Sequence, residues 1–199
     1  VNSGGLLQIS GGMVQSTTVG SGGTLQLGKH GILSSTQVES GGVINGFLFG
    51  QSGTLESGIQ VSNTRVTGSA TLDFGQTAFA TTVESGGGMT VFDDAAATAT
   101  RVNSGGTLQI QDGGTLNAAD VSAGGMVAAS GGAIFSGILS LAGTLDAQGT
   151  VNAAEMELQL NLSASETAQK SFMVNNLDAL TDLGAITIQA AADQAAGVY

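Results

Sequence analysis

The sequence predicts an all-β protein, a single-stranded β-solenoid in which short parallel strands stack coil upon coil. The first observation is a recurring phrase, Val-x-Ser-Gly-Gly, which opens at Val1, Val19, Val38, Val83 and Val102. The second is the step between adjacent copies, which is 18 or 19 residues, with a near copy opening at Val121. A period near 20 is typical of solenoids, whose coils bury apolar side chains only against their neighbours.

The repeat over residues 102–120 indicates how one coil is built. Val102 is followed by a turn at residues 103–106 and then by residues 107–111, in which apolar and polar side chains alternate. This alternation predicts a half-buried strand. A second turn at residues 112–114 is made of Asp and Gly, which tolerate the left-handed backbone of tight turns, and it leads into a second short strand.

The same residue types recur at the same offsets, so we expect columns of like side chains in the interior. Six residues after the opening valine stand Leu7, Leu25, Ile44, Met89, Leu108 and Val127. Eight residues after it stand Ile9, Leu27, Gly46, Val91, Ile110 and Ala129. The glycine pairs are expected to form the corners of the coils, at Gly4, Gly5, Gly22, Gly23, Gly41, Gly42, Gly86, Gly87, Gly105, Gly106, Gly124 and Gly125.

The register loosens between Val38 and Val83, where 45 residues hold two coils. Residues 61–64 appear as the opening of the intervening coil, although they lack the Gly-Gly corner. We expect residues 51–60 to bulge outward as a loop. Insertions in solenoids lie on one face and often carry binding, so this loop is either a specific binding feature or a neutral insertion.

The repeat fades after about residue 150, which divides the chain into repeats over residues 1–155 and a β-rich cap or start of a next module over residues 156–199. Alternation predicts a strand at residues 156–162 and another at residues 185–188. The segment between them, residues 163–184, is either a short helix or a long loop. Terminal coils are expected to be atypical because they have to close an open ladder.

Composition excludes several classes of partner. The chain has 4 basic and 15 acidic residues and a net charge of −11, whereas nucleic acid and anionic lipid require clustered Lys and Arg. No run of eighteen apolar residues is present, so direct membrane insertion is not expected. Cysteine is absent, which excludes disulfide and thiolate–zinc frameworks. Because Val1 falls inside a repeat, we interpret the chain as a fragment whose targeting segments lie elsewhere.

Catalytic chemistry is sparse, and we predict that the chain is not an enzyme. His30 is the only histidine and stands at an expected turn, and no Gly-x-Ser-x-Gly elbow supports a triad. A polysaccharide-cleaving β-helix enzyme is the remote alternative, which would use Asp93 and Asp94 with Arg101 nearby. Sugar-cleaving sites usually need two carboxylates at a fixed separation and aromatic or basic subsites, whereas only 4% of the residues are aromatic.

No cofactor or metal is predicted. Calcium-binding β-rolls repeat Gly-Gly-x-Gly-x-Asp, and here Asp112 and Asp146 do not form such a column. Hydroxyl residues are dense at 16–18, 34–36, 81–82 and 98–100, just before the next coil opens, and we expect them to surface on the solenoid wall. Either threonine simply suits exposed strands, or these hydroxyls offer a ladder for glycosylation or hydrogen bonding.

Over about residues 1–150 the sequence resembles the AIDA-type repeats of autotransporter adhesins from Gram-negative bacteria. The shared signature is Ser-Gly-Gly-x-Leu-x-Ile/Val, then Gly-Gly, then a Ser/Thr-rich strand returning to Val, as in residues 102–121. The resemblance implies a right-handed parallel β-helix passenger, secreted through a C-terminal barrel outside this sequence and displayed on the bacterial surface. Members of the family mediate host-cell attachment, autoaggregation and biofilm growth.

The resemblance also implies O-heptosylation by a glycosyltransferase, for which the acceptors by position would be Ser16, Thr18, Ser34, Thr36, Thr82 and Thr100. Regions 43–82 and 156–199 depart from the simple family pattern. The predicted function is adhesion to host-cell or bacterial surface molecules, or to a second copy, through many weak contacts that add along the rod. The alternatives are a passive spacer and a fibre that assembles through open ladder ends.

Overall fold

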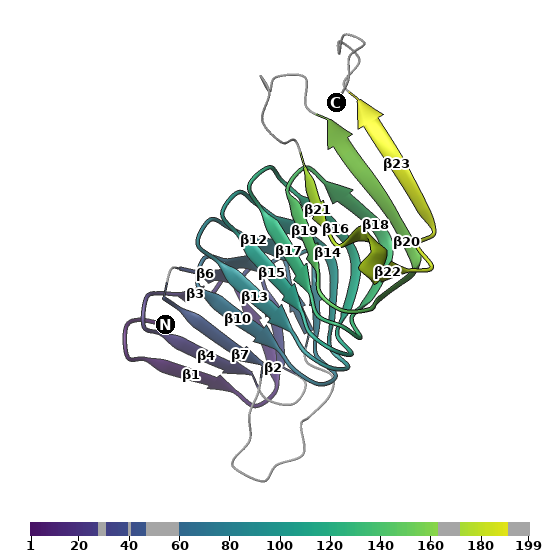
Figure 1. The fold of residues 1–199 in the computed structure, drawn as a ribbon. Coiled ribbons are helices and arrows are strands. Elements are labelled where there is room, and N and C mark those ends of the chain that lie inside the picture. Colours follow the sequence, from purple (N-terminus) through teal and green to yellow (C-terminus); the bar gives the residue numbers. More distant parts are fainter. Residues whose placement is uncertain (28–30, 40, 47–59, 163–171, 191–199) are drawn as a thin grey trace.

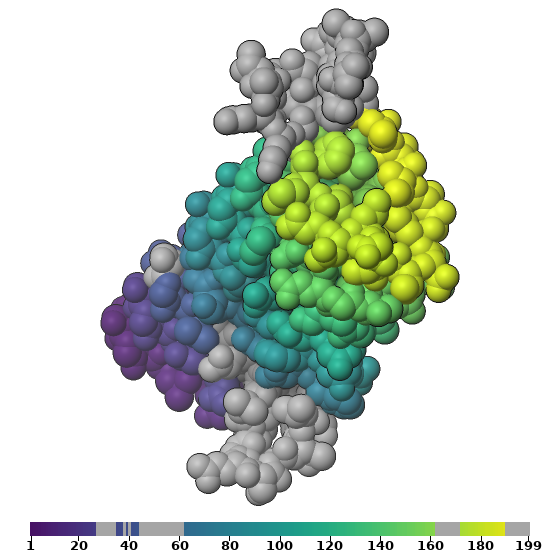
Figure 2. Space-filling model, viewed as in Figure 1, coloured from purple at the N-terminus to yellow at the C-terminus, as the bar shows by residue number. Residues whose placement is uncertain are grey.

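The chain is a β-solenoid of stacked parallel strands, which confirms the predicted fold class (Figure 1). The computed structural model describes residues 1–27, 31–39, 41–46, 60–162 and 172–190. Figure 2 follows the coils in sequence order from the purple N-terminal end to the yellow C-terminal end. Within the described residues the single helical element is a 3₁₀ turn, η1 (Leu177–Ala179). The right-handed sense of the coil stays a prediction.

One wall of the solenoid is a nine-stranded parallel sheet with one strand from each coil. Eight of these strands are four residues long and the last has three, which explains why the sequence shows such short runs of alternation. In spatial order the strands are β1 (Leu6–Ile9), β4 (Thr24–Leu27), β7 (Val43–Gly46), β10 (Ser69–Leu72), β13 (Gly88–Val91), β15 (Thr107–Ile110), β17 (Met126–Ala129), β19 (Thr144–Ala147) and β21 (Met173–Asn175).

A second sheet forms the other two walls, which meet at a bend. Before the bend lie β2 (Gly12–Gln15), β5 (Gly31–Ser34), β8 (Gln60–Ser62) and β11 (Thr77–Phe79). After it lie β3 (Thr18–Val19), β6 (Gln37–Val38), β9 (Arg65–Val66) and β12 (Thr82–Val83). Longer strands run through both walls: β14 (Ala96–Val102), β16 (Thr115–Val121), β18 (Ile134–Leu141) and β20 (Val151–Leu162).

The bend between these two walls is made by one residue in the left-handed conformation. Ala99 has φ 51° and Ala118 has φ 59°, and the equivalent residues in other coils are Ser16, Ser35, Asn63 and Ala80. Such values are uncommon outside glycine. This corner was not predicted, because the serine or alanine that most coils place there carries no strong turn signal.

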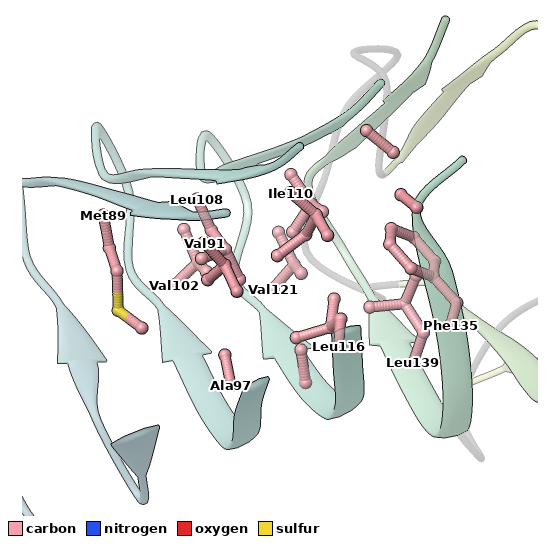
Figure 3. Packing of buried hydrophobic residues seen from close by; sticks show 14 of the residues in the cluster. Met89, Val91, Ala97, Val102, Leu108, Ile110, Leu116, Val121, Phe135 and Leu139 are labelled. Carbon is pink, nitrogen blue, oxygen red and sulfur yellow. The ribbon is translucent and has the colours of Figure 1, made fainter. Parts of the chain in front are cut away.

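The predicted interior columns are confirmed by the strand register. Leu7, Leu25 and Ile44 align on successive strands, as do Met89, Leu108 and Val127. The opening valines also form a column, in which Val83, Val102 and Val121 are 0% exposed. Figure 3 shows Val102, Leu108, Ile110 and Val121 clustered in the interior. Burial of these aliphatic side chains supplies the main stabilising free energy.

The irregular coil corrects one expectation. Its opening valine is Val66, which pairs with Val38 on one side and Val83 on the other. Val61 instead aligns with Leu33 and Ala78 on the wall before the bend. The assignment to residues 61–64 was wrong because this coil has no Ser-Gly-Gly phrase to mark its turn. Of the expected loop at residues 51–60, only Gln60 lies within the described residues, and it begins β8.

The two glycines of each corner are required for different reasons. Gly105 has φ +75°, a conformation that favours glycine. A Cβ on Gly106 would lie 2.7 Å from the carbonyl oxygen of Val83 in the preceding coil, too close for any side chain. The first glycine therefore allows the turn, and the second allows the coils to approach each other.

Parallel stacking continues past residue 155. β20 contains the strand expected at residues 156–162 but begins at Val151, and β23 (Ala185–Ala190) contains the strand expected at residues 185–188. β22 (Leu180–Thr181) and β23 both pair with β20 in parallel. Residues 163–171 lie outside the described residues. The proposed division into repeats and cap stays a prediction.

Candidate functional site

In β1, β4, β10, β13 and β15, the outer face of the nine-stranded sheet carries a column of uncharged polar side chains, which continues as Ala128 and Asp146. Thr107 and Gln109 point outward because Leu108 and Ile110, which alternate with them, are fully buried. The position of Gln109 is occupied by polar residues in other coils as well, and the strand register aligns Gln8, Gln26, Thr71, Thr90 and Gln109 in one column. The Thr90 hydroxyl donates to Oε1 of Gln109 at 3.5 Å. Neighbouring rungs of such a column lie about 4.8 Å apart.

The wall before the bend carries a mixed surface of hydroxyl, amide and apolar side chains. Its outward columns are Thr77, Ala96, Thr115 and Ile134, and beside them Phe79, Thr98, Asn117 and Ser136. Phe79 is 56% exposed and Ile134 is 40% exposed. This wall therefore presents apolar groups among hydrogen-bonding groups, unlike the polar column of the nine-stranded sheet.

The six candidate acceptor hydroxyls fall in different environments. Ser16 is exposed at the left-handed bend, Thr18 is exposed on β3, and Thr82 is half-buried on β12. Ser34 belongs to β5, but its side chain lies outside the described part of the structure. The remaining two, Thr36 and Thr100, are inside the solenoid.

A column of buried threonines lies directly after the bend. Thr36, Thr64, Thr81 and Thr100 are each 1% exposed. The expectation that Thr36 and Thr100 surface on the wall is therefore wrong. The burial of Thr100 could have been predicted from the sequence. Thr100 stands two residues before the buried Val102, and period-2 alternation puts both side chains on the same side of a strand.

Three of these buried hydroxyls have no hydrogen-bond partner among the described residues, namely those of Thr36, Thr81 and Thr100. A buried hydroxyl without a partner costs about 1–3 kcal/mol. Further along the rod the same column is apolar, because Thr100 aligns with Ala119, which aligns with Leu139 and then Leu158. The core is thus more polar in its N-terminal coils than in its C-terminal coils.

The wall after the bend holds ion pairs between neighbouring coils. Arg65 pairs with Glu84 at 2.7 Å, and Arg101 pairs with Asp120 at 2.8 Å. The second carboxylate oxygen of Glu84 accepts a hydrogen bond from the Asn103 amide at 2.7 Å. The hydrogen bonds from Asn103 and Arg65, with the Arg65 charge, lower the pKa of the Glu84 carboxyl. Both described arginines are therefore neutralised locally.

The corner between the nine-stranded sheet and the second sheet holds a groove of about 440 Å³. Its lining comes from turns of three successive coils: Asp73, Phe74, Phe92, Asp93, Gln111 and Asp112. Phe74 and Phe92 are each 42% exposed. Burial raises the pKa of the Asp73 carboxyl. This groove was not predicted, because it forms only where the turns that follow the strands of the nine-stranded sheet lie side by side.

The arrangement does not assemble the catalytic residues considered from sequence. Asp93 and Asp94 lie in the turn after β13, whereas Arg101 lies near the far end of β14 and pairs with Asp120. His30 lies outside the described residues. Among the residues that are described, no group of three or more His, Cys, Asp or Glu is placed to hold a metal ion. Across the same part of the chain, no helix has the length and apolar character needed to cross a membrane.

Comparison with known proteins shows that part of the chain is similar to a family of bacterial adhesins. Residues 74–125, which include β11 to β16, match the model of a family described as the adhesin of the bacterial autotransporter system, probable stalk. The resemblance to AIDA-type adhesin repeats is confirmed over this segment. A search of curated proteins found no significant match. Among solved structures, the crystal structure of a TibC-catalyzed hyper-glycosylated TibA fragment is 21% identical, with a TM-score of 0.42, over 96% of this chain and 87% of that chain.

Proposed function

We propose that this chain is part of the surface-displayed passenger of a bacterial autotransporter-type adhesin. Its walls would contact host-cell or bacterial surface molecules, or another copy, and so mediate cell adhesion, autoaggregation or biofilm growth. The match of residues 74–125 to an adhesin stalk family carries this proposal. It is supported by outward columns that repeat from coil to coil over the same segment.

The mechanism we propose is binding by repetition rather than catalysis. Each outward threonine or glutamine offers one weak polar contact, and the ladder repeats that contact about every 4.8 Å. Contacts made after the first are intramolecular, so they add through effective concentration. Because buried columns already hold the strands rigid, little backbone ordering is required on binding.

The second candidate is a passive spacer that only projects another part of the protein. The description of the matched family as a probable stalk favours it. The two roles differ in what they require of the surface: adhesion requires particular outward side chains, whereas a spacer requires only length.

The experiment compares two changes in cells that display the parent protein. One variant lacks residues 1–150, and the other keeps full length but carries T71A, T90A and Q109A on the outer polar column. An adhesive wall predicts loss of attachment in both variants at normal surface display. If only the deletion reduces attachment, the spacer role is supported and the adhesive role of this column is rejected.

We further propose Ser16, Thr18 and Thr82 as acceptors for a surface glycosyltransferase, with Ser34 kept as a sequence-based candidate. Thr36 and Thr100 are excluded from the set because a buried hydroxyl cannot be reached in the folded chain. Peptide mass mapping of protein isolated from the producing bacterium tests this set. Sugar on Ser16, Thr18 and Thr82 supports the proposal, and sugar confined to other positions contradicts it.

A further inference from the structure

The corner groove combines aromatic rings with carboxylates in an alternating pattern. The register that aligns Leu72, Val91 and Ile110 puts Asp73, Phe92 and Gln111 in one column. The next residue of each turn forms a second column, Phe74, Asp93 and Asp112. Each ring therefore has a carboxylate in its own column, on a neighbouring coil.

The carboxylates of this groove are not neutralised by the described arginines. Arg65 pairs with Glu84 and Arg101 pairs with Asp120, both on the wall after the bend. Asp73, Asp93 and Asp112 form no ion pair with a basic residue among those described. The groove is thus a site of uncompensated negative charge on a protein whose net charge is −11.

The backbone beneath the groove is fixed in place, so its shape is preformed. The Phe92 N–H donates to the Leu72 carbonyl at 2.9 Å, and the Gln111 N–H donates to the Val91 carbonyl at 2.8 Å. The Asp73 N–H donates to the side-chain oxygen of Gln76, which is 1% exposed. A preformed groove loses little conformational entropy when a ligand enters.

We propose that this Asp–Phe groove is a docking site for a basic segment of a partner protein, which lays arginine or lysine side chains against Phe74 and Phe92. The face of an aromatic ring attracts a cationic group, and the aliphatic stem of the side chain covers the apolar ring. The carboxylates of Asp93 and Asp112 supply the opposite charge. Charge complementarity and the exposed rings thus select the same kind of occupant.

The proposed binding requires both the aromatic rings and the carboxylates of the groove. This requirement distinguishes it from general attraction between opposite charges. A polycation drawn only by net charge would bind any exposed carboxylates on the surface. Asp178 and Asp182 are exposed aspartates in the segment around η1 and do not line the groove. Replacing both by asparagine therefore removes the same charge as D93N/D112N and serves as the control.

The test is fluorescence anisotropy of labelled hexa-arginine with the purified chain, with hexa-citrulline as the uncharged peptide of similar shape. We expect hexa-arginine to bind and hexa-citrulline not to bind. F74A/F92A is expected to weaken binding at least tenfold, since each ring contributes a factor of roughly five. D93N/D112N is expected to weaken it similarly, and D178N/D182N to change it less than twofold.

Thermal unfolding of each variant checks that the fold is retained, which is expected because both rings are surface residues. The proposal is overturned if hexa-arginine does not bind the unaltered chain, if F74A/F92A binds as tightly as that chain, or if D178N/D182N weakens binding as much as D93N/D112N. These results are independent of the adhesion experiment, because they are measured with the purified chain and a defined peptide.

Discussion

The hydroxyl oxygen of Ser85 lies 2.8 Å from the position that a Cβ atom on Gly105 would occupy in the next coil. The same relationship joins Ser21 to Gly41 at 2.8 Å and Ser104 to Gly124 at 2.6 Å. Each serine therefore fills the space that the following coil's glycine leaves open. The Ser-Gly-Gly phrase is repeated because each copy is a packing requirement of its neighbour.

This relationship predicts that G105A is more destabilising than G86A. Both glycines have positive φ, +75° and +78°, so both variants carry backbone strain of about 1–2 kcal/mol. Only Gly105 has a neighbour, since a Cβ on Gly86 would meet nothing within 4 Å. Urea titration gives the free energy of unfolding of G105A and of G86A. The double variant S85A/G105A should return to the level of G86A, and equal values for G105A and G86A would contradict the packing relationship.

The interior columns predict opposite effects at adjacent positions of β15. L108D buries a carboxylate at a fully buried site and should unfold the neighbouring coils, a loss of at least about 4 kcal/mol. Q109D changes an exposed side chain on the outer face and should cost less than about 0.5 kcal/mol. Circular dichroism during heating gives the melting temperatures, and equal values for the two variants would defeat the assigned register.

The buried threonine column predicts stabilising substitutions. T81V and T100V replace an unpartnered buried hydroxyl by a methyl group of nearly the same shape, so each should raise the free energy of unfolding by about 1–2 kcal/mol. T82V is the matched control on the adjacent outward position, where little change is expected. A loss of stability in T81V and T100V would mean that their hydroxyls are hydrogen-bonded in solution.

The lowered pKa of Glu84 predicts a contribution to stability that is lost in acid. Its folded pKa lies below the ordinary value of 4.5, so the contribution is present above that value and disappears as pH falls through the folded pKa. E84Q should therefore show a smaller loss of unfolding free energy between neutral pH and pH about 3 than the unaltered chain. E155Q, at an exposed glutamate, is the control, and identical pH profiles for all three proteins would reject the contribution.

The regular coils were predictable because every signal in them agrees. The opening valine, the residues six and eight positions after it and the glycine pair all recur together, and the register aligns them as expected. Val66 was missed because its coil lacks the serine and the first glycine of the pair, whereas Gly68 aligns with the second glycines Gly42 and Gly87.

The remaining features depend on relations between coils that a linear pattern does not display. Ala99 and Ala118 adopt the left-handed bend although alanine has no preference for it. The Asp–Phe groove arises only when turns of three coils are aligned side by side. The scaffold and the likeness of residues 74–125 to adhesin stalk repeats were therefore predictable from single coils, and the groove was not.

The change along the core from threonine to alanine and leucine gives the rod a mechanical polarity. Coils that enclose unpartnered hydroxyls open at lower cost than coils sealed by Leu139 and Leu158. Under a pulling force or shear, we expect the N-terminal coils to peel away first while the C-terminal coils hold. Such a rod would unfold coil by coil from its N-terminal end and dissipate the load in steps. The unfolded coils would then refold against the intact C-terminal coils as a template.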